Sequence, residues 1–371
     1  MTDRQPGNGY DVVVIGGGAA GLNGALVLAR ARRSVAVLGA GAPRNAPAEG
    51  VHGLLGHEGL PPKELLARGR EEVRAYGGDV LTGEVTAVAR DGSEGGSGDD
   101  GRDDSRGGDQ GADGSGSGFR VTLADGRSVR ARRLLVTSGI TDELPDVPGL
   151  RERWGRDVLH CPYCHGWEVR DRPIGVLASG PMSVHQALLF RQWSDDVAFF
   201  THTMAPPTDE QAEELAARGI RVVAGEVAGL EITEDRLSGL RLGDGTVVAR
   251  EAVAVASRMV ARGGFLAPLG LHPVEHPSGA GVHIPVDAAG RTRVPGVWAA
   301  GNVTDLVGQV GASAAAGAGA AAQINADLIA EETRQAVAAR RNVFPSGHDG
   351  ASPGNQARVA EPSRAERRHG L

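Results

Sequence analysis

YDVVVIGGGAAG, residues 10–21, decides the fold of this chain. A β-branched run ends in glycine there, and an Ala- and Leu-rich segment follows to about Arg32, which predicts a strand, a tight turn and a helix. A second apolar run at residues 34–38 predicts the next strand. The glycines fit the spacing G-x-G-x-x-G, which lets the backbone approach a pyrophosphate and supplies N–H donors from the start of the helix. We therefore expect a β-α-β unit that binds a dinucleotide through these residues: Gly16, Gly18, Ala19, Ala20 and Gly21.

The acidic residue that usually completes such a site is missing. A carboxylate at the end of the second strand, about 20 residues further on, would bind the adenosine ribose. Gly39 stands there instead. Either Arg44, Asn45 or backbone groups replace the acid, or the dinucleotide binds more weakly.

The later chain repeats this organisation weakly. Its 371 residues are enough for two domains, because globular domains hold about 150 residues each. After the first unit we expect a helix and three strands, at residues 63–76, 79–90, 119–123 and 128–137. A second β-α-β unit follows, at residues 172–178, 183–193 and 197–201. A buried strand and a small-residue helix come last, at residues 294–300 and 311–329. This order is typical of an α/β protein with two Rossmann-like nucleotide-binding domains.

Residues 91–118 form a low-complexity segment of 28 residues with 11 glycines. It has no large apolar side chain and cannot offset its chain entropy, so we expect a disordered hairpin tip, with a docking segment as the alternative. The segment holds eight acids and two arginines, which leaves the rest of the chain close to neutral despite a net charge of −7. That distribution argues against nucleic acid or an anionic membrane as partners.

We find no signal peptide and no membrane-spanning segment in the sequence, and expect a cytoplasmic protein. The two cysteines stand in HCPYCHGWE, residues 160–168. The spacing C-x-x-C suits a disulfide that opens and closes, and a neighbouring imidazole can depress a thiol pKa or carry protons. One alternative is a zinc site of Cys161, Cys164 and histidine, although no second ligand pair is evident. The other is a pair of inert core cysteines.

The order of the motifs resembles the low-molecular-weight thioredoxin reductase family of flavoproteins. Besides the two motifs above, it includes TSG at residues 137–139 and GVWAAGN at residues 296–302. The resemblance covers about residues 10–330. It implies bound FAD and two three-layer ββα domains, the second inserted into the first. The implied parts are an FAD-binding domain of residues 1–148 and 265–333, a central NAD(P)H-like domain of residues 149–264 with the C-x-x-C pair, and a disordered tail of residues 334–371.

The resemblance also implies roles for individual residues. Cys161 and Cys164 would be the redox pair, with Cys164 nearer the flavin and Cys161 meeting the substrate. His165 is the candidate base for the thiols, since imidazole exchanges protons near neutrality, unless it only caps the turn. His160 is a weaker candidate. The further flavin-binding residues would be Arg44, Asn45, Gly139, Gly301, Asn302, Gln309 and Val310.

Several departures from the reductases narrow the resemblance. The second glycine motif reads ASGPMS at residues 178–183, and no Lys or Arg occurs from Gln192 to Ala217 to hold the 2′-phosphate of NADPH. His165 and Asn302 each replace an aspartate of the reductases. These changes resemble a dithiol oxidase branch with CPYCHGWE-like active sites. Such enzymes close the disulfides of dithiolopyrrolones, epidithiodiketopiperazines and disulfide-bridged depsipeptides.

The closer resemblance implies a small-molecule dithiol as substrate and molecular oxygen as electron acceptor. The substrate would exchange with the Cys161–Cys164 disulfide, the enzyme dithiol would reduce FAD, and oxygen would reoxidise the flavin to give hydrogen peroxide. A first alternative is a thioredoxin reductase that uses NADPH or a donor such as ferredoxin to reduce a thioredoxin-like protein. A second is a non-catalytic redox-sensing or binding module, which only Gly39 favours. A homodimer is expected from the resemblance alone.

Overall fold

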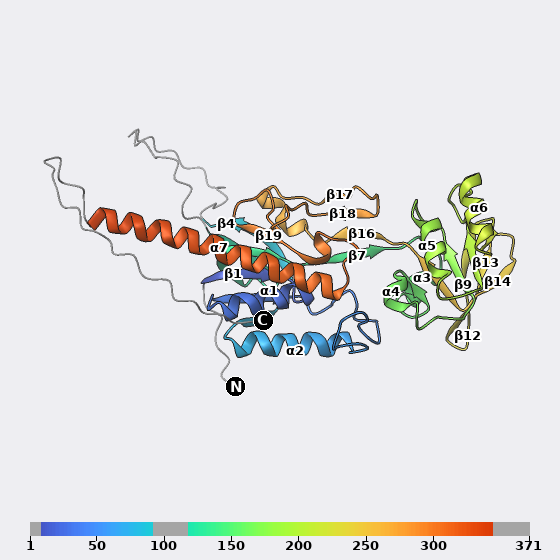
Figure 1. Cartoon of the computed structure of the whole chain (residues 1–371), viewed down its shortest axis with the longest axis horizontal. Coiled ribbons are helices and arrows are strands. Elements are labelled where there is room, and N and C mark those ends of the chain that lie inside the picture. Colours follow the sequence, from blue (N-terminus) through green and yellow to red (C-terminus); the bar gives the residue numbers. More distant parts are fainter. Residues whose placement is uncertain (1–8, 92–117, 344–371) are drawn as a thin grey trace, which may run out of the picture. The chain divides into compact units, whose positions relative to one another are not determined.

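The computed structural model describes residues 9–91 and 118–343 (Figure 1). The chain divides into two compact units, the first ending at Asp327 and the second beginning at Leu328. The segment expected to form a disordered hairpin tip falls mainly on residues 92–117, which lie outside the described residues. The expected tail beyond residue 343 also lies outside them.

A seven-stranded mixed sheet forms around the first glycine motif, in the order β3-β2-β1-β6-β5-β4, with β19 beside β6. The strands are β1 (Gly9–Ile15), β2 (Val35–Gly39), β3 (Asp79–Thr82), β4 (Val85–Arg90), β5 (Phe119–Leu123), β6 (Ser128–Val136) and β19 (Val297–Ala299). Strand β1 pairs in parallel with β2 and β6, whereas β5 pairs antiparallel with β4 and β6. Helix α1 (Ala19–Arg30) packs on this sheet, and α2 (Pro62–Ala75) packs against α1.

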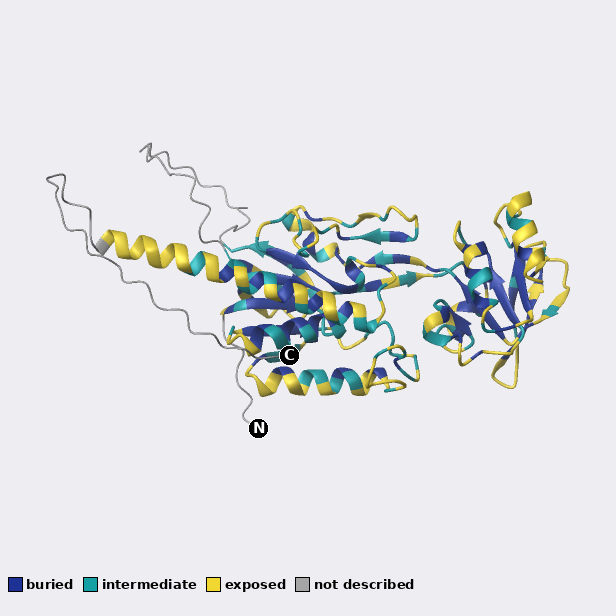
Figure 2. Cartoon of the chain, viewed as in Figure 1, coloured by how far each residue is buried: buried dark blue, intermediate teal, exposed yellow. Residues whose placement is uncertain are grey.

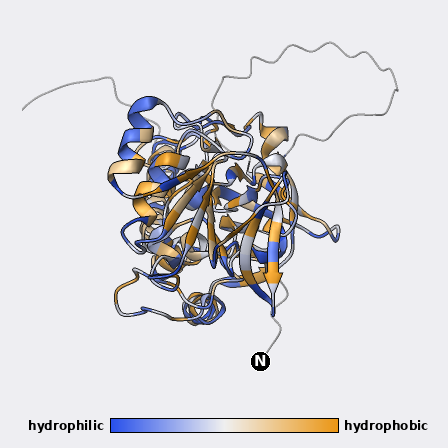
Figure 3. Ribbon diagram, turned by 90° about the vertical axis from the view of Figure 1, so that its right-hand side faces the viewer, coloured by the Kyte–Doolittle hydropathy of each residue, from blue (hydrophilic) through white to orange (hydrophobic). Residues whose placement is uncertain are grey.

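Burial explains why these segments are strands. Val12, Val13 and Val14 of β1 have no exposed surface, because a parallel strand covered on both faces can be apolar throughout. The central strands are mainly buried and apolar (Figures 2 and 3). The single strand expected over residues 79–90 is two strands. Strand β3 pairs with β2 and ends before Gly83, whose N–H donates to the Gly39 carbonyl at 3.0 Å, and β4 then pairs with β5.

The central segment holds a five-stranded sheet in the order β11-β10-β9-β15-β8. Its strands are β8 (Val158–Leu159), β9 (Ile174–Leu177), β10 (Val197–Phe200), β11 (Arg221–Val223) and β15 (Ala252–Val255). A separate antiparallel sheet contains β12 (Val227–Thr233), β13 (Arg236–Leu242) and β14 (Val247–Ala249). The helices of this segment are α3 (Leu150–Arg153), α4 (Pro162–His165), α5 (Ser183–Phe190) and α6 (Asp209–Ala217).

Two apolar clusters define the layers of the central segment. One joins the five-stranded sheet to α5 and α6 through residues such as Phe190 and Leu215. The other joins the same sheet to the antiparallel sheet through Leu230 and Leu240. The helices, the five-stranded sheet and the antiparallel sheet therefore form three layers. The expected α/β fold with two Rossmann-like domains is confirmed.

The central segment is inserted between two strands of a third small sheet. Strand β7 (Ile140–Glu143) precedes it and pairs antiparallel with β16 (Arg258–Ala261), which follows it. Strands β17 (Val274–Glu275) and β18 (Gly281–His283) complete that sheet, and the short helices η1 (Gly264–Leu269) and η2 (Gly301–Val303) follow β16 and β19. The domain boundaries at residues 148 and 264 stay predictions.

Helix α7 (Val310–Val343) is longer than the helix expected over residues 311–329, and the prediction of a disordered tail from residue 334 is wrong for residues 334–343. The reason is local. Residues 328–343 are rich in Ala, Glu and Arg and contain neither Gly nor Pro, so nothing in them ends a helix. Within the described residues, no helix combines the length and apolar character needed to cross a membrane.

Candidate active site

The first glycine motif is shaped by close backbone contacts at the turn between β1 and α1. Gly16 has a φ of +121°, and a Cβ there would lie 2.1 Å from the Thr137 carbonyl oxygen. A Cβ at Gly21 would lie 1.9 Å from the Gly16 carbonyl oxygen. The Thr137 hydroxyl donates to that same oxygen at 2.9 Å. Only glycine fits at these two positions, which brings the start of α1 against the end of the sheet.

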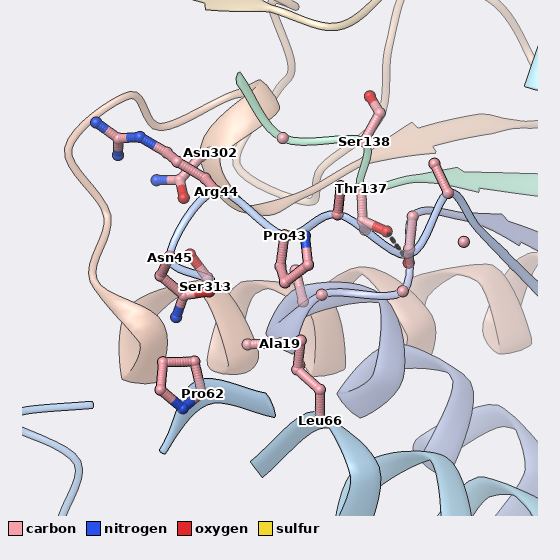
Figure 4. Close-up of a pocket in the computed structure, with 18 of the residues that line it drawn as sticks. Ala19, Pro43, Arg44, Asn45, Pro62, Leu66, Thr137, Ser138, Asn302 and Ser313 are labelled. Atoms are coloured by element: carbon pink, nitrogen blue, oxygen red, sulfur yellow. Dashed lines mark hydrogen bonds between the residues drawn. The ribbon is translucent and has the colours of Figure 1, made fainter. Parts of the chain in front are cut away.

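Gly18 differs from its neighbours because it faces open space. A Cβ at Gly18 would meet no protein atom within 4 Å, and Gly18 lines a cavity of about 680 Å³. Its neighbour Ala19, the first residue of the twelve-residue helix α1, lines the same cavity (Figure 4). The turn therefore leaves room for a bulky group where α1 begins. N–H groups at a helix start, next to a glycine without a side chain, fit the pyrophosphate of a dinucleotide such as FAD.

The cavity gathers most of the predicted site residues. Those that line it are Gly16, Gly18, Ala19, Ala20, Arg44, Asn45, Gly139, Cys164, His165, Asn302, Gln309 and Val310. Three predicted residues do not line it, namely Gly21, Cys161 and Gly301. Gly21 and Gly301 instead allow close packing, since a Cβ at Gly301 would lie 2.8 Å from the Ala20 Cβ. The roles of these residues in binding stay predictions.

Gly39, which stands where an acid was expected, lies at the end of β2 and lines the cavity. A Cβ there would lie 3.5 Å from the Gly17 backbone, an ordinary contact, so a side chain would fit. Arg44, a suggested substitute, is already engaged: its Nε and Nη2 donate to the two carboxylate oxygens of Asp142 at 2.6 and 2.7 Å. Arg44 keeps its Nη1 donors, so Arg44, Asn45 and the backbone all stay candidates for the ribose.

Asp142 is held ionised by its partners. Burial raises its pKa, but the hydrogen bonds and charge of Arg44, together with the Ser257 hydroxyl donating at 2.6 Å, outweigh burial and hold the pKa below its ordinary value. No sequence motif singles out Asp142 as part of the site. Its neighbours in sequence are unremarkable, and its partners come from distant segments.

Asn302 acts first on its own loop. Its Nδ2 donates to the carbonyl oxygens of Asp305 and Gly308 at 2.9 and 2.8 Å, which fixes the turn before α7. An aspartate could not make these two donations, because an ionised carboxylate only accepts hydrogen bonds. The exchange of aspartate for Asn302 is therefore explained locally by the loop that it holds.

The cysteine pair lies at α4, and both thiols are free. Cys161 is the N-cap residue of this short helix and Cys164 lies in its turn. A hydrogen bond from the Cys164 thiol lowers the pKa of Cys161 to about 7 against the opposing effect of burial, with help from the N–H groups of Cys164 and Tyr163 and the charge of Arg44. Donating that proton raises the pKa of Cys164. Of the two thiols, Cys161 is therefore the one that ionises more readily.

Two histidines flank the pair, and burial lowers the pKa of each below its ordinary value. His165 lines the cavity and its Nε2 is buried without a hydrogen-bond partner, as is the Nδ1 of His160. A neutral imidazole is the form that can accept a proton from a thiol. Among the described residues no three His, Cys, Asp or Glu side chains gather so as to hold a metal ion.

The second glycine motif, between β9 and α5, is filled by its own chain. The hydroxyl of Ser183, which is 2% exposed, accepts the N–H groups of Ser179 and Gly180 at 3.0 and 3.2 Å. In the first motif, by contrast, Gly18 faces the cavity and a Cβ there would meet no protein atom within 4 Å. The missing glycines are visible in the sequence, but no sequence pattern points to Ser183. The same holds for His52, Glu58 and Glu168, which lie close together.

Comparisons with known proteins agree with this architecture. The model of the family described as pyridine nucleotide-disulphide oxidoreductase matches residues 10–322. The crystal structure of HlmI is 46% identical, with a TM-score of 0.79, and the match covers 91% of this chain and 99% of that one. An oxidoreductase from Agrobacterium tumefaciens is 32% identical, with a TM-score of 0.73 and coverage of 91% and 99%.

Curated relatives carry thioredoxin reductase names. Thioredoxin reductase tcpT from Claviceps purpurea is 28% identical over 339 residues, which are 88% of this chain and 98% of that protein. A probable thioredoxin reductase from Arthroderma benhamiae is 32% identical over 181 residues, 48% of this chain but only 39% of that relative's length. The chain therefore belongs to the pyridine nucleotide-disulphide oxidoreductase family, as a thioredoxin reductase-like, FAD-dependent oxidoreductase.

Proposed function

We propose that this protein oxidises a small-molecule dithiol to its cyclic disulfide and passes the electrons to molecular oxygen. The observation that carries this direction is the filled second glycine motif. The N–H groups of Ser179 and Gly180 already donate to Ser183, so they are not free to bind the pyrophosphate of NADPH. Electrons would then have to enter through thiols.

The segment after β10 supports the same direction. It lacks Lys and Arg from Gln192 to Ala217, and cationic side chains are what a 2′-phosphate requires. His202, in this segment, accepts the N–H of Val227 at its Nδ1 at 3.1 Å, and burial lowers its pKa. An imidazole that accepts at Nδ1 and resists protonation is a poor partner for a phosphate.

The cysteine pair would perform two exchange steps. One substrate thiolate attacks the Cys161 sulfur of the Cys161–Cys164 disulfide, and Cys164 leaves as a thiolate. The second substrate thiolate then attacks the substrate sulfur of the mixed disulfide, and Cys161 leaves. The low pKa of Cys161 favours this last step, because a thiol of lower pKa leaves faster. The substrate disulfide and a reduced cysteine pair result.

The residues around the cavity would complete the turnover. Cys164 lines the cavity and Cys161 does not, which supports Cys164 as the cysteine facing the flavin and Cys161 as the one that meets substrate. His165 takes up the thiol proton. The chemistry that FAD supplies when bound is removal of two electrons from the reduced pair and their transfer to oxygen, which with two protons becomes hydrogen peroxide. Each dithiol oxidised would consume one oxygen molecule.

An anaerobic titration of the purified, FAD-loaded protein tests this proposal. NADPH is added first and a small dithiol second, while the visible absorbance of the flavin is followed. We expect the dithiol to bleach the flavin and NADPH to leave it oxidised. Readmitting air should restore the absorbance with one hydrogen peroxide per disulfide formed. Cys161→Ser is the control that should abolish bleaching by the dithiol. Bleaching by micromolar NADPH within one turnover would overturn the proposal.

The second candidate function is a thioredoxin reductase, and the names of relatives such as tcpT favour it. In that case electrons would come from NADPH or a protein donor such as ferredoxin, and the partner would be a thioredoxin-like protein. The same titration separates the oxidase from a reductase that uses NADPH, and adding reduced ferredoxin in place of NADPH separates it from a reductase that uses a protein donor. We also propose a homodimer in the cytoplasm, on the basis of the resemblance to thioredoxin reductases.

A further inference from the structure

A carboxylate–histidine pair lies beside the cysteine pair, in the loop that follows β2. His52 lines the same cavity as Cys164 and His165. Its Nδ1 lies 2.6 Å from the Glu58 Oε1, and the other oxygen of Glu58 accepts the N–H of Gly53 at 2.9 Å. Because Glu58 is tied to its own loop, it holds the His52 ring in one orientation. The Nε2 of that ring faces away from Glu58.

The free side of the His52 ring faces the cysteine motif. Its Nε2 lies 3.6 Å from the Oε1 of Glu168, the last residue of CPYCHGWE. This distance suits an ion pair, and a shift of about 1 Å would make a direct hydrogen bond. The side chain of His52 is 24% exposed and that of Glu168 is 40% exposed. The pair therefore reaches from the cavity to solvent.

His165 needs neighbouring groups to which it can release a proton. Its Nε2 is buried and has no hydrogen-bond partner, although it stands next to Cys164 in the chain. Burial lowers the pKa of His165, the negative charge of Glu168 opposes that effect, and the charge of His52 adds to it. A buried imidazole that takes a proton from a thiol must release it before the next turnover. Glu168 and His52 are the groups that act on it electrostatically.

We propose that His52 is a proton-transfer residue of this site, which with Glu168 carries protons between His165 and solvent while Glu58 positions its ring. The inference deepens the proposed function and rests on its thiol–disulfide exchange, in either direction. Oxidation of one dithiol releases two protons and two electrons. The electrons leave through the cysteine pair and FAD, and the protons leave through the imidazoles.

The last transfer follows from the geometry of the ring. The hydrogen bond that Glu58 accepts from His52 and the one from the Gly53 N–H hold the pKa of Glu58 below its ordinary value, so Glu58 stays ionised and keeps the ring in place. The His52 Nε2 takes up a proton on the side of Glu168 and passes it on to water, since the His52 side chain is 24% exposed.

Other charged groups act on the same site and influence how the rate of disulfide opening should depend on pH. Glu58 and Glu168 lie next to His52, while the charges of Glu168 and His52 act on His165. Arg44 acts on both cysteine sulfurs, and Arg44 and Asp142 act on His160. The variants below leave Arg44 and Asp142 unchanged, so a change in the profile would come from His52 or Glu58.

The test measures how fast dithiothreitol opens the Cys161–Cys164 disulfide in the full-length, FAD-loaded protein. The experiment is run without oxygen. Samples are quenched with an alkylating reagent, mass spectrometry counts the free thiols, and the flavin absorbance gives the electrons that the reduced pair has already passed to FAD, so the two readings together measure how fast the disulfide opens. We expect His52→Gln to slow opening about tenfold or more at neutral pH, since general acid–base groups contribute at least that much. Added imidazole should restore most of the rate.

Two further variants make the result specific. Glu58→Gln should slow opening less than His52→Gln and should also respond to imidazole, because the ring is present but loosely held. His57→Gln alters an exposed histidine of the same loop and should keep the wild-type rate. Circular dichroism checks that each variant is folded.

An unchanged rate and pH profile in His52→Gln would overturn the inference. A slower rate that imidazole does not restore would overturn it too, because it would mean that His52 only supports the loop. Failure of the proposed direction is seen separately, as bleaching of the wild-type flavin by NADPH. That outcome would leave the exchange rates of the variants, and hence this inference, untouched.

Discussion

At the scale of single residues, the cysteine pair is made unequal by its position on α4. Cys161 collects the hydrogen bonds of Cys164 and of two backbone N–H groups, whereas Cys164 keeps the proton that it donates. A C-x-x-C spacing alone would leave the two sulfurs equivalent. The asymmetry arises because the Cys164 thiol, and after it the N–H groups of Cys164 and Tyr163, donate to the Cys161 sulfur at the start of α4.

This asymmetry predicts which thiol reacts first. In the reduced protein, iodoacetamide should alkylate Cys161 before Cys164, with a rate that rises as pH increases through about 7, the pKa of Cys161. Replacing Cys164 by alanine removes the thiol donor and should move that rise to higher pH. Mass spectrometry of digested protein at each pH identifies the modified cysteine. Earlier alkylation of Cys164 would contradict the assignment.

At the scale of elements, the turn from β1 to α1 shows that glycines of one motif have different functions. A Cβ at Gly16 would lie 2.1 Å from a backbone oxygen, and a Cβ at Gly21 would lie 1.9 Å from another. No residue other than glycine therefore fits at these two positions. Gly18 has a negative φ of −84° and faces the cavity. The first two shape the element, and the third leaves space for what the element binds.

The difference predicts opposite outcomes for two substitutions in this turn. Gly18→Val should fold with nearly wild-type thermal stability but retain little FAD, because its side chain enters the cavity. Gly21→Ala should lower the free energy of unfolding by roughly 1–3 kcal/mol or more, since overpacking forces the backbone apart. Thermal melts of the apoproteins and the flavin content after purification measure both effects. Loss of stability in Gly18→Val beyond that in Gly21→Ala would refute this distinction.

At the scale of the whole molecule, ion pairs join segments that are far apart in sequence. Arg44 and Asp142 are 98 residues apart and Ser257 lies a further 115 residues beyond Asp142. Asp157 pairs with Arg153 four residues away and accepts the N–H of Leu237, 80 residues further on, and the pKa of Asp157 is lowered because these bonds outweigh burial. Asp142 thus links β7 to the segments that hold Arg44 and Ser257, and Asp157 links α3 to β13 within the insertion.

The lowered pKa values predict how stability depends on pH. A carboxyl group whose pKa is depressed in the folded state adds stability above its ordinary pKa of 3.8, and loses it as pH falls through the folded value. We expect the free energy of unfolding, measured with urea, to fall steadily below about pH 5. Asp142→Asn should be less stable at neutral pH and should show a shallower fall. An equally steep fall in that variant would exclude Asp142 as a contributor.

Much of the fold could be predicted from the sequence because its signals are local. Buried parallel strands are apolar throughout, a G-x-G-x-x-G turn needs glycine for contacts within a few residues, and the cysteine motif is contiguous. Strand and helix patterns therefore located both Rossmann-like units. The same local reasoning failed at residues 334–343, where good helix formers continue α7, and at residues 79–90, where Gly83 divides one expected strand into two.

The sequence by itself determined the two nucleotide-fold units, the family's motifs and the spacing of the cysteine pair, since each depends on residues that are neighbours in the chain. Only the tertiary structure decided how these parts are used. It engaged Arg44 with Asp142, filled the second glycine motif with the Ser183 hydroxyl, and brought His52 within 3.6 Å of Glu168. Such contacts depend on packing between distant segments, and no periodicity or spacing along the chain records which distant side chains will meet.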